Sequence, residues 1–418
     1  MSRTNPHNSS QDRELSRRGL LKAAGGVTAA LAVGASAVAV NGGTANAAPA
    51  TFVHPGALHA YGELNRAKVR VAAGNDPWLS GWNRLTANGH SASSWNPNPQ
   101  TTIIRGGTGE NYGILYNDIH AAYQNALRWK IAGTTANGDA AVRILNAWSA
   151  RLTTLTGNAD RFLASGIYGY QFANAAELMR DYSGFDLARF KTMMLNVFYP
   201  LNNQFLNGHN DACITNYWAN WDLCNMNSIL AIAILCDDGA KYDQAVNYFK
   251  NGAGNGSIKH AVPFIYDNVD GYALGQWQES GRDQGHTMMG MGQMGAFCEM
   301  AWSQGDDLYG YDANRFMKGA QYVAKYNLGQ SVPFTTYTWG TGQNCAQQSH
   351  TAISSASRGQ ARPVWDILYY HYAKRRGLSV PYIQAMAESV RPEGGGGDYG
   401  STSGGFDQLG FGTVMYAK

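Results

Sequence analysis

The chain has 418 residues, of which 44% are hydrophobic and 15% are charged, so a sizeable buried core is possible. Of its 32 basic and 29 acidic residues, five basic and two acidic ones lie in residues 1–47, which leaves 27 of each sign and no net charge on the remainder. That balance argues against a nucleic-acid partner, and it requires that any acidic ligand be held by a few local groups.

The first 47 residues have the three parts of an export signal. Arg17 and Arg18 lie in a basic stretch, residues 23–40 are mostly small and apolar, and Ala45-Asn46-Ala47 has the pattern of a signal peptidase site. The paired arginines favour the twin-arginine pathway, and the apolar run is too rich in alanine and glycine for a membrane anchor. We expect cleavage after Ala47, secretion, and no membrane contact afterwards.

Helical periodicity dominates the rest of the chain, with apolar side chains recurring at intervals of three and four residues. Predicted helices cover residues 115–129, 139–152 (capped by Asp139), 186–197 (capped by Asp186), 216–236 (ended by Gly239), 286–302, 312–327 and 363–376 (begun by Pro363), with one strand in 332–339. Short glycine-containing loops between them indicate antiparallel helical hairpins. We predict an all-α fold, an (α/α) toroid or incomplete barrel with few short strands, as a single domain over 48–418 and a monomer.

Composition also bears on the ligand. Fifty glycines and 49 aromatic residues suit a carbohydrate cleft, in which aromatic faces pack on sugar rings, although an aromatic core with ordinary loops would give the same counts.

Five cysteines leave at least one unpaired, and Cys224 and Cys236 fit buried free thiols. No spacing typical of metal ligands is present, so we expect neither a metal nor a cofactor.

Two polar segments interrupt the apolar helices. In the segment 215–222, Asn216 and Asn220 would lie one turn apart on the same helix face, where their amides need partners, either a ligand or another helix. In the segment 276–286, eight of eleven residues are polar and a buried helix follows His286 at once. Such junctions often carry function on a rigid scaffold.

Tyr217-Trp218-Ala219-Asn220-Trp221 resembles the Tyr-Trp-Ala-x-Trp motif of bacterial alginate lyases, helical toroids that cleave uronate polysaccharides by β-elimination. Asp270-Gly271, Glu279, Arg282 and the segment 167–181 are similar to further parts of that family, and the resemblance extends over residues 54–375. Where the family has Asn-Asn-His before the Tyr-Trp pair, this chain has Cys213-Ile214-Thr215. The catalytic tyrosine that the family has after the arginine is replaced by a methionine-rich stretch, which indicates a divergent branch acting on alginate, glucuronan or a similar uronan.

The resemblance implies a site for β-elimination. The uronate carboxylate must be neutralised, a base must remove the C5 proton, and an acid must protonate the leaving O4. We assign neutralisation to Asn216 and Arg282 with Asn220 in support, the base to His286, and the acid to Tyr217, with Tyr170 or Tyr272 as substitutes. The remaining candidates for substrate binding are Trp218, Trp221, Trp277, Gln278 and Glu279.

Two other functions stay open at the level of the sequence. A glycoside hydrolase needs two carboxyl groups across the scissile bond, which Asp222 together with Glu279 or Asp283 could supply. A non-catalytic carbohydrate-binding protein would show binding without product. The expected partner in each case is a polysaccharide, acidic in the case of the lyase.

Overall fold

The computed structural model describes residues 48–401 and 403–418, so the predicted export signal lies outside the described residues. From residue 47 onward the chain forms one compact unit. Its longer elements are α2 (Tyr61–Ala72), α3 (Trp78–Ala87), β1 (Thr102–Ile104), α4 (Tyr112–Ala132), α5 (Thr135–Ser149), β2 (Thr154–Thr156), α6 (Arg161–Leu163), α7 (Gly169–Met179), α8 (Leu187–Met193), α9 (Tyr199–Gly208), α10 (Ala219–Cys236), α11 (Gly239–Asn251), α12 (Ile258–Ala261), β3 (Phe264–Val269), β4 (Tyr272–Gln276), α13 (Gln284–Ser303), α14 (Tyr311–Asn327), β5 (Tyr337–Trp339), β6 (Gln348–His350), α15 (Trp365–Tyr369), α16 (Pro381–Val390), α17 (Ser403–Phe406) and α18 (Gly412–Tyr416). Short helical segments of tighter or wider pitch are η1 (Gly89–Ser91), η2 (Ala164–Tyr168), η3 (Met194–Phe198), η4 (His209–Asp211), η5 (Gln278–Gly281) and η6 (Tyr370–Arg375).

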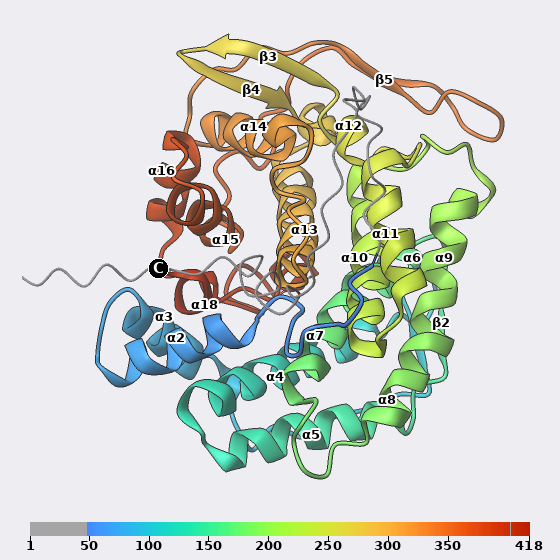
Figure 1. Ribbon diagram of the computed structural model, residues 1–418. Helices are drawn as coiled ribbons and strands as arrows, with labels where there is room; N and C mark the ends of the chain where they lie inside the picture. Colours follow the sequence, from blue (N-terminus) through green and yellow to red (C-terminus); the bar gives the residue numbers. More distant parts are fainter. Residues whose placement is uncertain (1–47, 402) are drawn as a thin grey trace, which may run out of the picture. The chain divides into compact units, whose positions relative to one another are not determined.

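The helices form a closed ring (Figure 1). Helix α2 packs on α4, α4 on α7, α7 on α10, α10 on α13, α13 on α15, α15 on α18, and α18 again on α2. Outer helices pack on this ring, with α5 on α4, and α9 and α11 on α10. The structure therefore confirms the predicted all-α toroid.

Two ring helices, α10 and α13, are buried almost throughout. In α10 every residue is buried except Trp221 and Cys236, and in α13 every residue is buried except His286 and Trp302. Glycines allow other segments to approach both helices closely. A Cβ on Gly166 would lie 2.4 Å from Sγ of Cys224 in α10, and a Cβ on Gly292 of α13 would lie 2.5 Å from the side chain of Val364. Trp221 and His286 are thus the partly exposed residues near the N-terminal ends of these two helices.

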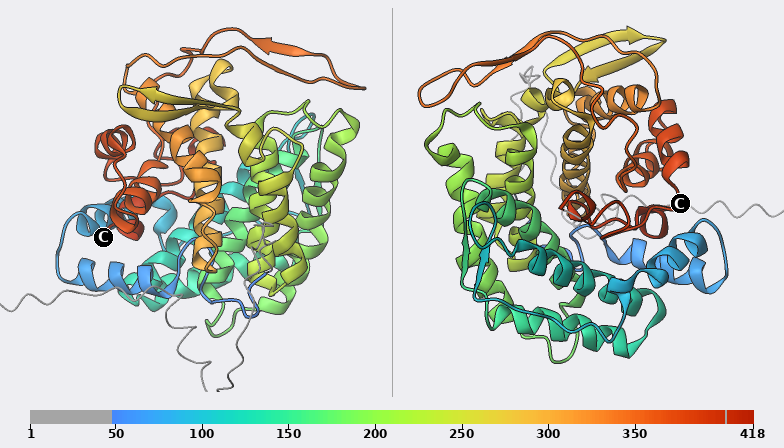
Figure 2. Two further views of the ribbon diagram at one scale, coloured as in Figure 1. Left: turned by 45° about the horizontal axis from the view of Figure 1, so that its top comes forward. Right: turned by 180° about the vertical axis from the view of Figure 1, so that it is seen from behind.

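The strands form three small sheets. β1 and β2 pair in parallel with Thr102 opposite Thr154, β3 and β4 pair antiparallel with Phe264 opposite Gln276, and β5 and β6 pair antiparallel with Tyr337 opposite His350. The β3–β4 hairpin and β5 lie together at one end of the ring (Figure 2). Among the described residues, no helix combines the length and apolarity of a membrane-crossing segment.

Several predicted helix boundaries are wrong, although each predicted helix exists. Asp139 lies inside α5 and caps nothing, whereas Asp186 accepts the backbone N–H of Arg189 as predicted. Gly239 begins α11, since α10 ends at Cys236 with Asp237 in a left-handed conformation. Pro363 precedes α15 instead of beginning it. The predicted strand is confined to residues 337–339.

Candidate active site

A cleft of about 380 Å³ opens at the N-terminal ends of α10 and α13. This volume lies within the range of roughly 300–1,000 Å³ that is usual for ligand pockets. The lining residues are Arg105, Asp160, Leu163, Asn220, Trp221, Arg282, His286, Met289, Arg362, Gly404 and Asp407. Helix N-termini carry positive partial charge, and the three arginines of the lining outnumber its two aspartates, so the cleft suits an anionic ligand.

His286 stands in the first turn of α13, where Asp283 fixes it twice. Asp283 caps the helix, because its Oδ1 accepts the backbone N–H of His286 at 2.7 Å, and its Oδ2 lies 2.7 Å from the imidazole Nδ1. Arg282 Nη2 lies 3.1 Å from the imidazole Nε2. A guanidinium only donates, so Nε2 accepts, and the proton of a neutral His286 is on Nδ1, facing Asp283. The imidazole therefore presents an unprotonated Nε2 beside Arg282.

The electrostatics of Asp283 reinforce this arrangement. Burial raises the pKa of its carboxyl, but the hydrogen bonds and charge of His286 and the charge of Arg282 outweigh burial and lower the pKa to about 2. The carboxylate is thus charged at every pH at which the protein is expected to work, and it holds the Nδ1 proton in place.

Glu279 connects the N-terminal end of α10 to Arg282, which directly precedes α13. Its side chain is fully buried, and its carboxylate accepts the backbone N–H of Asn220 at 2.7 Å and the amide of Asn220 at 2.9 and 3.0 Å. Arg282 Nη1 donates to the same carboxylate at 3.3 Å. Burial raises the pKa of Glu279, while Arg282 and Asn220 oppose the shift. Glu279 thereby fixes both Asn220 and Arg282 against the cleft.

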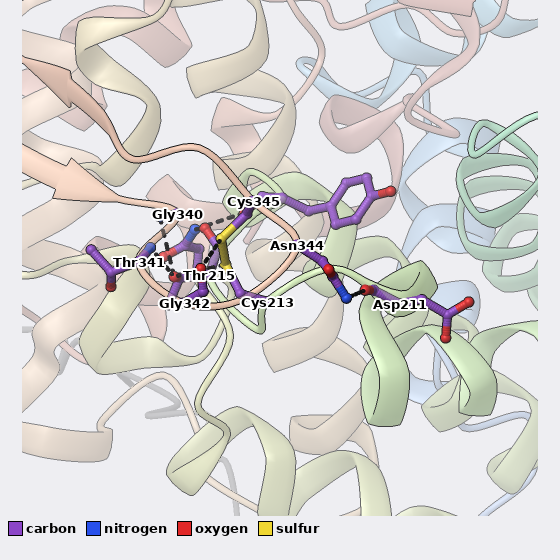
Figure 3. The surroundings of a disulfide bond; sticks show 10 residues. Asp211, Cys213, Thr215, Gly340, Thr341, Gly342, Asn344 and Cys345 are labelled. Carbon is purple, nitrogen blue, oxygen red and sulfur yellow. Dashed lines mark hydrogen bonds between the residues drawn. A yellow bond between two sulfur atoms is a disulfide. The ribbon is translucent and has the colours of Figure 1, made fainter.

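A disulfide attaches the β5–β6 hairpin to the loop before α10 (Figure 3). It joins Cys213 to Cys345, and the hydroxyl of Thr215 accepts the backbone N–H groups of Gly340 and Thr341 at 3.2 and 3.3 Å. All three other cysteines, Cys224, Cys236 and Cys298, are free. The predicted free thiols of Cys224 and Cys236 are therefore confirmed, with Cys236 only half-buried.

The hairpin brings aromatic side chains to the site. The Trp218 ring lies 4.5 Å from that of Trp339 and 5.5 Å from that of His350, and the Arg282 guanidinium lies 4.7 Å from the centre of the Trp218 ring. Burial and the charge of Arg282 lower the pKa of His350. Trp218 thus supports Arg282 from the side of the hairpin.

Four of the predicted site residues meet in the cleft: Asn220, Trp221, Arg282 and His286. Asn216 does not join them, and its predicted place on a helix is wrong, because α10 begins at Ala219 and Asn216 lies in the preceding loop. The phenol of Tyr217 accepts from Asn210 at 3.1 Å, and its ring packs between Phe205 and Trp221.

The other predicted residues serve the framework. Tyr170 is buried and donates to the backbone carbonyl of Asp407 at 2.9 Å, Tyr272 packs against Tyr382, and Trp277 is fully buried in the core. Gln278 is buried and accepts the first N–H of α10, from Ala219, at 3.0 Å. Within the described ranges no tyrosine lines the cleft, so the structure places none of the three proposed tyrosine acids there.

The carboxyl pair of the hydrolase alternative also fails. Asp222 is fully buried away from the cleft and is held by His209 at 2.8 Å, Tyr248 at 3.0 Å and the backbone N–H of Gly256 at 2.9 Å. It cannot stand opposite Glu279 or Asp283 across a substrate. Among the residues the structure describes, no three His, Cys, Asp or Glu side chains are grouped as a metal site would require.

Reasoning from the sequence missed the wall formed by Arg105, Asp160, Arg362 and Asp407. Arg362 donates to Asp407 at 3.2 Å and to the carbonyl of Gly404 at 3.1 Å. These residues lie far from the two polar segments, in loops without a motif. The glycine pair after Arg105 and the glycine-rich stretch before Asp407 are the signals that could have drawn attention to them.

Comparison with known proteins identifies the class to which this fold and cleft belong. The sequence model of the alginate lyase family matches residues 110–333, more than half of the chain. The chain therefore belongs to the alginate lyase family and is a polysaccharide lyase. No curated protein sequence matches it.

Solved structures agree on the fold. Alginate lyase A1-III from Sphingomonas species A1 is 14% identical, with a TM-score of 0.54 over 88% of this chain and 98% of that one. An alginate lyase from Bacteroides ovatus is 12% identical, with a TM-score of 0.56 over 87% of this chain and 100% of that one. A variant of A1-III has been solved in complex with a tetrasaccharide, and it is 15% identical with a TM-score of 0.53 over 88% and 97% of the two chains.

Proposed function

We propose that this lyase cleaves a uronate-containing polysaccharide, such as alginate or glucuronan, by β-elimination in the cleft at the ends of α10 and α13. The observation that carries the proposal is the Asp283–His286–Arg282 arrangement, in which Asp283 orients an imidazole whose unprotonated Nε2 accepts a hydrogen bond from the guanidinium of Arg282. A base next to a cation is what proton removal at C5 of a uronate requires, since the developing charge is delocalised into the carboxylate.

Substrate binding activates His286 in this scheme. A uronate carboxylate accepts N–H groups from Arg282 more strongly than the neutral imidazole does, because both partners are charged. Arg282 then turns from Nε2 to the carboxylate, and the lone pair of Nε2 is released for the C5 proton. The amide nitrogen of Asn220 donates to both carboxylate oxygens of Glu279, so Asn220 lines the same wall but leaves neutralisation of the uronate carboxylate to Arg282.

We assign both proton transfers to His286. The imidazole takes the C5 proton, the electron pair of the C–H bond forms the C4–C5 double bond, and the C4–O4 bond breaks. The imidazolium then gives its Nε2 proton to O4, which leaves as an alcohol. This assignment replaces the three tyrosines because, in the described part of the chain, His286 is the cleft-lining side chain that readily accepts and donates a proton near neutral pH.

A panel of uronans tests the proposal, with the unsaturated product followed by ultraviolet absorbance. We expect signal from at least one of alginate, glucuronan and hyaluronan, and a loss of about 100- to 10,000-fold in kcat for His286→Ala. His260→Ala, which removes an exposed imidazole outside the cleft, is the matched control and should retain full activity. Saturable binding without product from any uronan, or full activity of His286→Ala, would contradict the proposal.

We also propose that the protein is exported by the twin-arginine pathway and acts as a monomer. The Arg17-Arg18 pair and the Ala45-Asn46-Ala47 pattern support export. Immunoblots of secreted and cellular fractions test the export, with accumulation of the full-length chain inside the cell as the contrary result. Light scattering of the purified protein gives the oligomeric state.

A further inference from the structure

Arg105 differs from the other two arginines of the cleft in forming no direct ion pair with a carboxylate of a described residue. Arg282 is paired with Glu279 at 3.3 Å and Arg362 with Asp407 at 3.2 Å. Arg105 takes part in no ion pair with any described residue, although its side chain is only 9% exposed. Burial disfavours its charge, but Tyr168 and the cleft carboxylates Asp407 and Asp160 act on the guanidinium without forming an ion pair, and its pKa is raised. The guanidinium therefore stays charged where it lines the cleft.

The backbone around Arg105 is rigid, so the charge is held in place. Its N–H continues the β1–β2 ladder by donating to the carbonyl of Thr156 at 3.0 Å. Gly157 allows this approach, since a Cβ there would lie 1.9 Å from the carbonyl oxygen of Arg105.

The guanidinium is flanked by two phenol rings, which leave most of its donors unused. Nη1 donates to the Tyr168 hydroxyl at 3.0 Å, and the guanidinium carbon lies 5.0 Å from the ring centre of Tyr112 and 5.6 Å from that of Tyr168. No other hydrogen bond from this side chain to a described residue is formed. The planar fork of Nε and Nη2 is therefore available to a ligand, and its geometry matches a carboxylate.

We propose that Arg105 binds the carboxylate of a second uronate, next to the one that loses its C5 proton, and so selects stretches of adjacent acidic sugars. The inference rests on the proposed function, since it takes the reacting uronate to lie at Arg282 and His286. Both positions line the same cleft but come from different elements, the end of β1 and the start of α13. Arg105 also lies outside residues 110–333, the segment that the family's sequence model matches.

Kinetics of Arg105→Gln test the proposal on the uronan that the wild type cleaves best and on a partly carboxyl-reduced preparation of it. On the native uronan we expect KM to rise about 10- to 100-fold, with kcat within about threefold of wild type, because a charge-assisted contact to a non-reacting residue is lost. On the carboxyl-reduced uronan the difference between variant and wild type should shrink. Arg105→Lys keeps the positive charge but lacks the planar guanidinium, so its KM on the native uronan should lie between those of wild type and Arg105→Gln.

The matched control is Arg189→Gln, which removes one arginine from the exposed surface of α8, where it pairs with Asp186. Its KM should equal that of the wild type. A KM of Arg105→Gln within about twofold of wild type, or an equal rise on both substrates, would overturn the proposal. Should Arg105→Gln fail to fold, Arg105→Lys carries the same test.

Failure of the proposed function can be told apart from failure of the Arg105 subsite, because binding can be measured without cleavage. If the wild type forms no unsaturated product from any uronan, calorimetric titration with oligosaccharides prepared from the same uronans measures binding directly. Binding to Arg105→Gln at least about tenfold weaker than to wild type then supports the subsite, whereas equal binding, or no binding by the wild type, contradicts it.

Discussion

Asp283 shows how a single carboxylate can organise a site without lining the cleft. It caps α13 through one oxygen and orients His286 through the other, and it stays charged because its pKa is lowered to about 2. Its two tasks can be separated by substitution, since an asparagine side chain also caps helices.

We expect Asp283→Asn to lower kcat by about 100- to 10,000-fold while α13 stays formed. The amide oxygen can still accept the N–H of His286, but the amide nitrogen opposite Nδ1 favours the tautomer with the proton on Nε2. The base is then blocked. Product formation followed by ultraviolet absorbance gives kcat and KM, and thermal unfolding checks the fold. An unchanged kcat would show that the tautomer does not matter.

At the scale of elements, the β5–β6 hairpin is held on the rim of the cleft by the Cys213–Cys345 disulfide, which closes a long loop because the two cysteines are 132 residues apart. Beneath it, the rings of Trp339 and His350 pack on Trp218, which in turn lies over Arg282. The disulfide thereby bears on the position of Arg282, to which we assign neutralisation of the uronate carboxylate.

The double substitution Cys213→Ser with Cys345→Ser should destabilise the protein by about 2–4 kcal/mol, because the unfolded chain regains the freedom that the long loop had lost. KM should rise several-fold as Trp218 loses its support, whereas kcat should change less. Thermal unfolding and steady-state kinetics measure the two effects. Cys236→Ser, at a half-buried free thiol, is the control, and equal behaviour of both variants would show that the hairpin is positioned without the disulfide.

Helix existence could be predicted from periodicity, but the start of α10 could not. The largely apolar residues 217–221 extend the helical pattern of α10 towards the N-terminus, so the sequence predicts that the helix already includes Asn216. In the structure the first N–H groups of α10 are accepted by Gln278 and Glu279, 59 residues further along the chain. A cap from so distant a segment has no local signature, so the boundary depends on the tertiary structure.

The same reason limits how much of the site could be predicted. Arg282, His286, Asn220 and Trp221 lie in two segments whose polar residues interrupt apolar helices, and they were found. Arg105 and Arg362 reach the cleft only because the ring closes, when α18 packs on α2 and brings the C-terminal part of the chain beside the N-terminal part. Ring closure therefore adds to the site a wall that no single motif contains.

At the scale of the whole molecule, His54, which precedes α2, links helices that are distant in sequence, α7 and α10. His54 Nδ1 lies 2.5 Å from Glu177 of α7, and Nε2 lies 2.7 Å from Asp237 at the end of α10. Arg180 and Lys191 also bind Asp237, at 2.7 and 3.0 Å. Burial lowers the pKa of His54, but Glu177 and Asp237 outweigh burial and Arg180, and the pKa is raised above 6.5.

Because its pKa is raised, His54 contributes more to the stability of the helical toroid in mild acid than at high pH. A histidine whose pKa is higher in the folded than in the unfolded chain adds stability that is fully present below about pH 6.5 and is lost as pH rises through the folded value. We expect His54→Gln to lower the free energy of unfolding by about 1 kcal/mol at pH 5.5, where the contacts of the imidazolium with two carboxylates are lost, and by much less at pH 9. Urea unfolding at both pH values measures the difference. The control is His260→Gln, at an exposed imidazole outside this cluster, and its effect on the free energy of unfolding should not depend on pH. If the loss of unfolding free energy in His54→Gln instead grew with pH, the contacts of His54 would be made by the neutral imidazole.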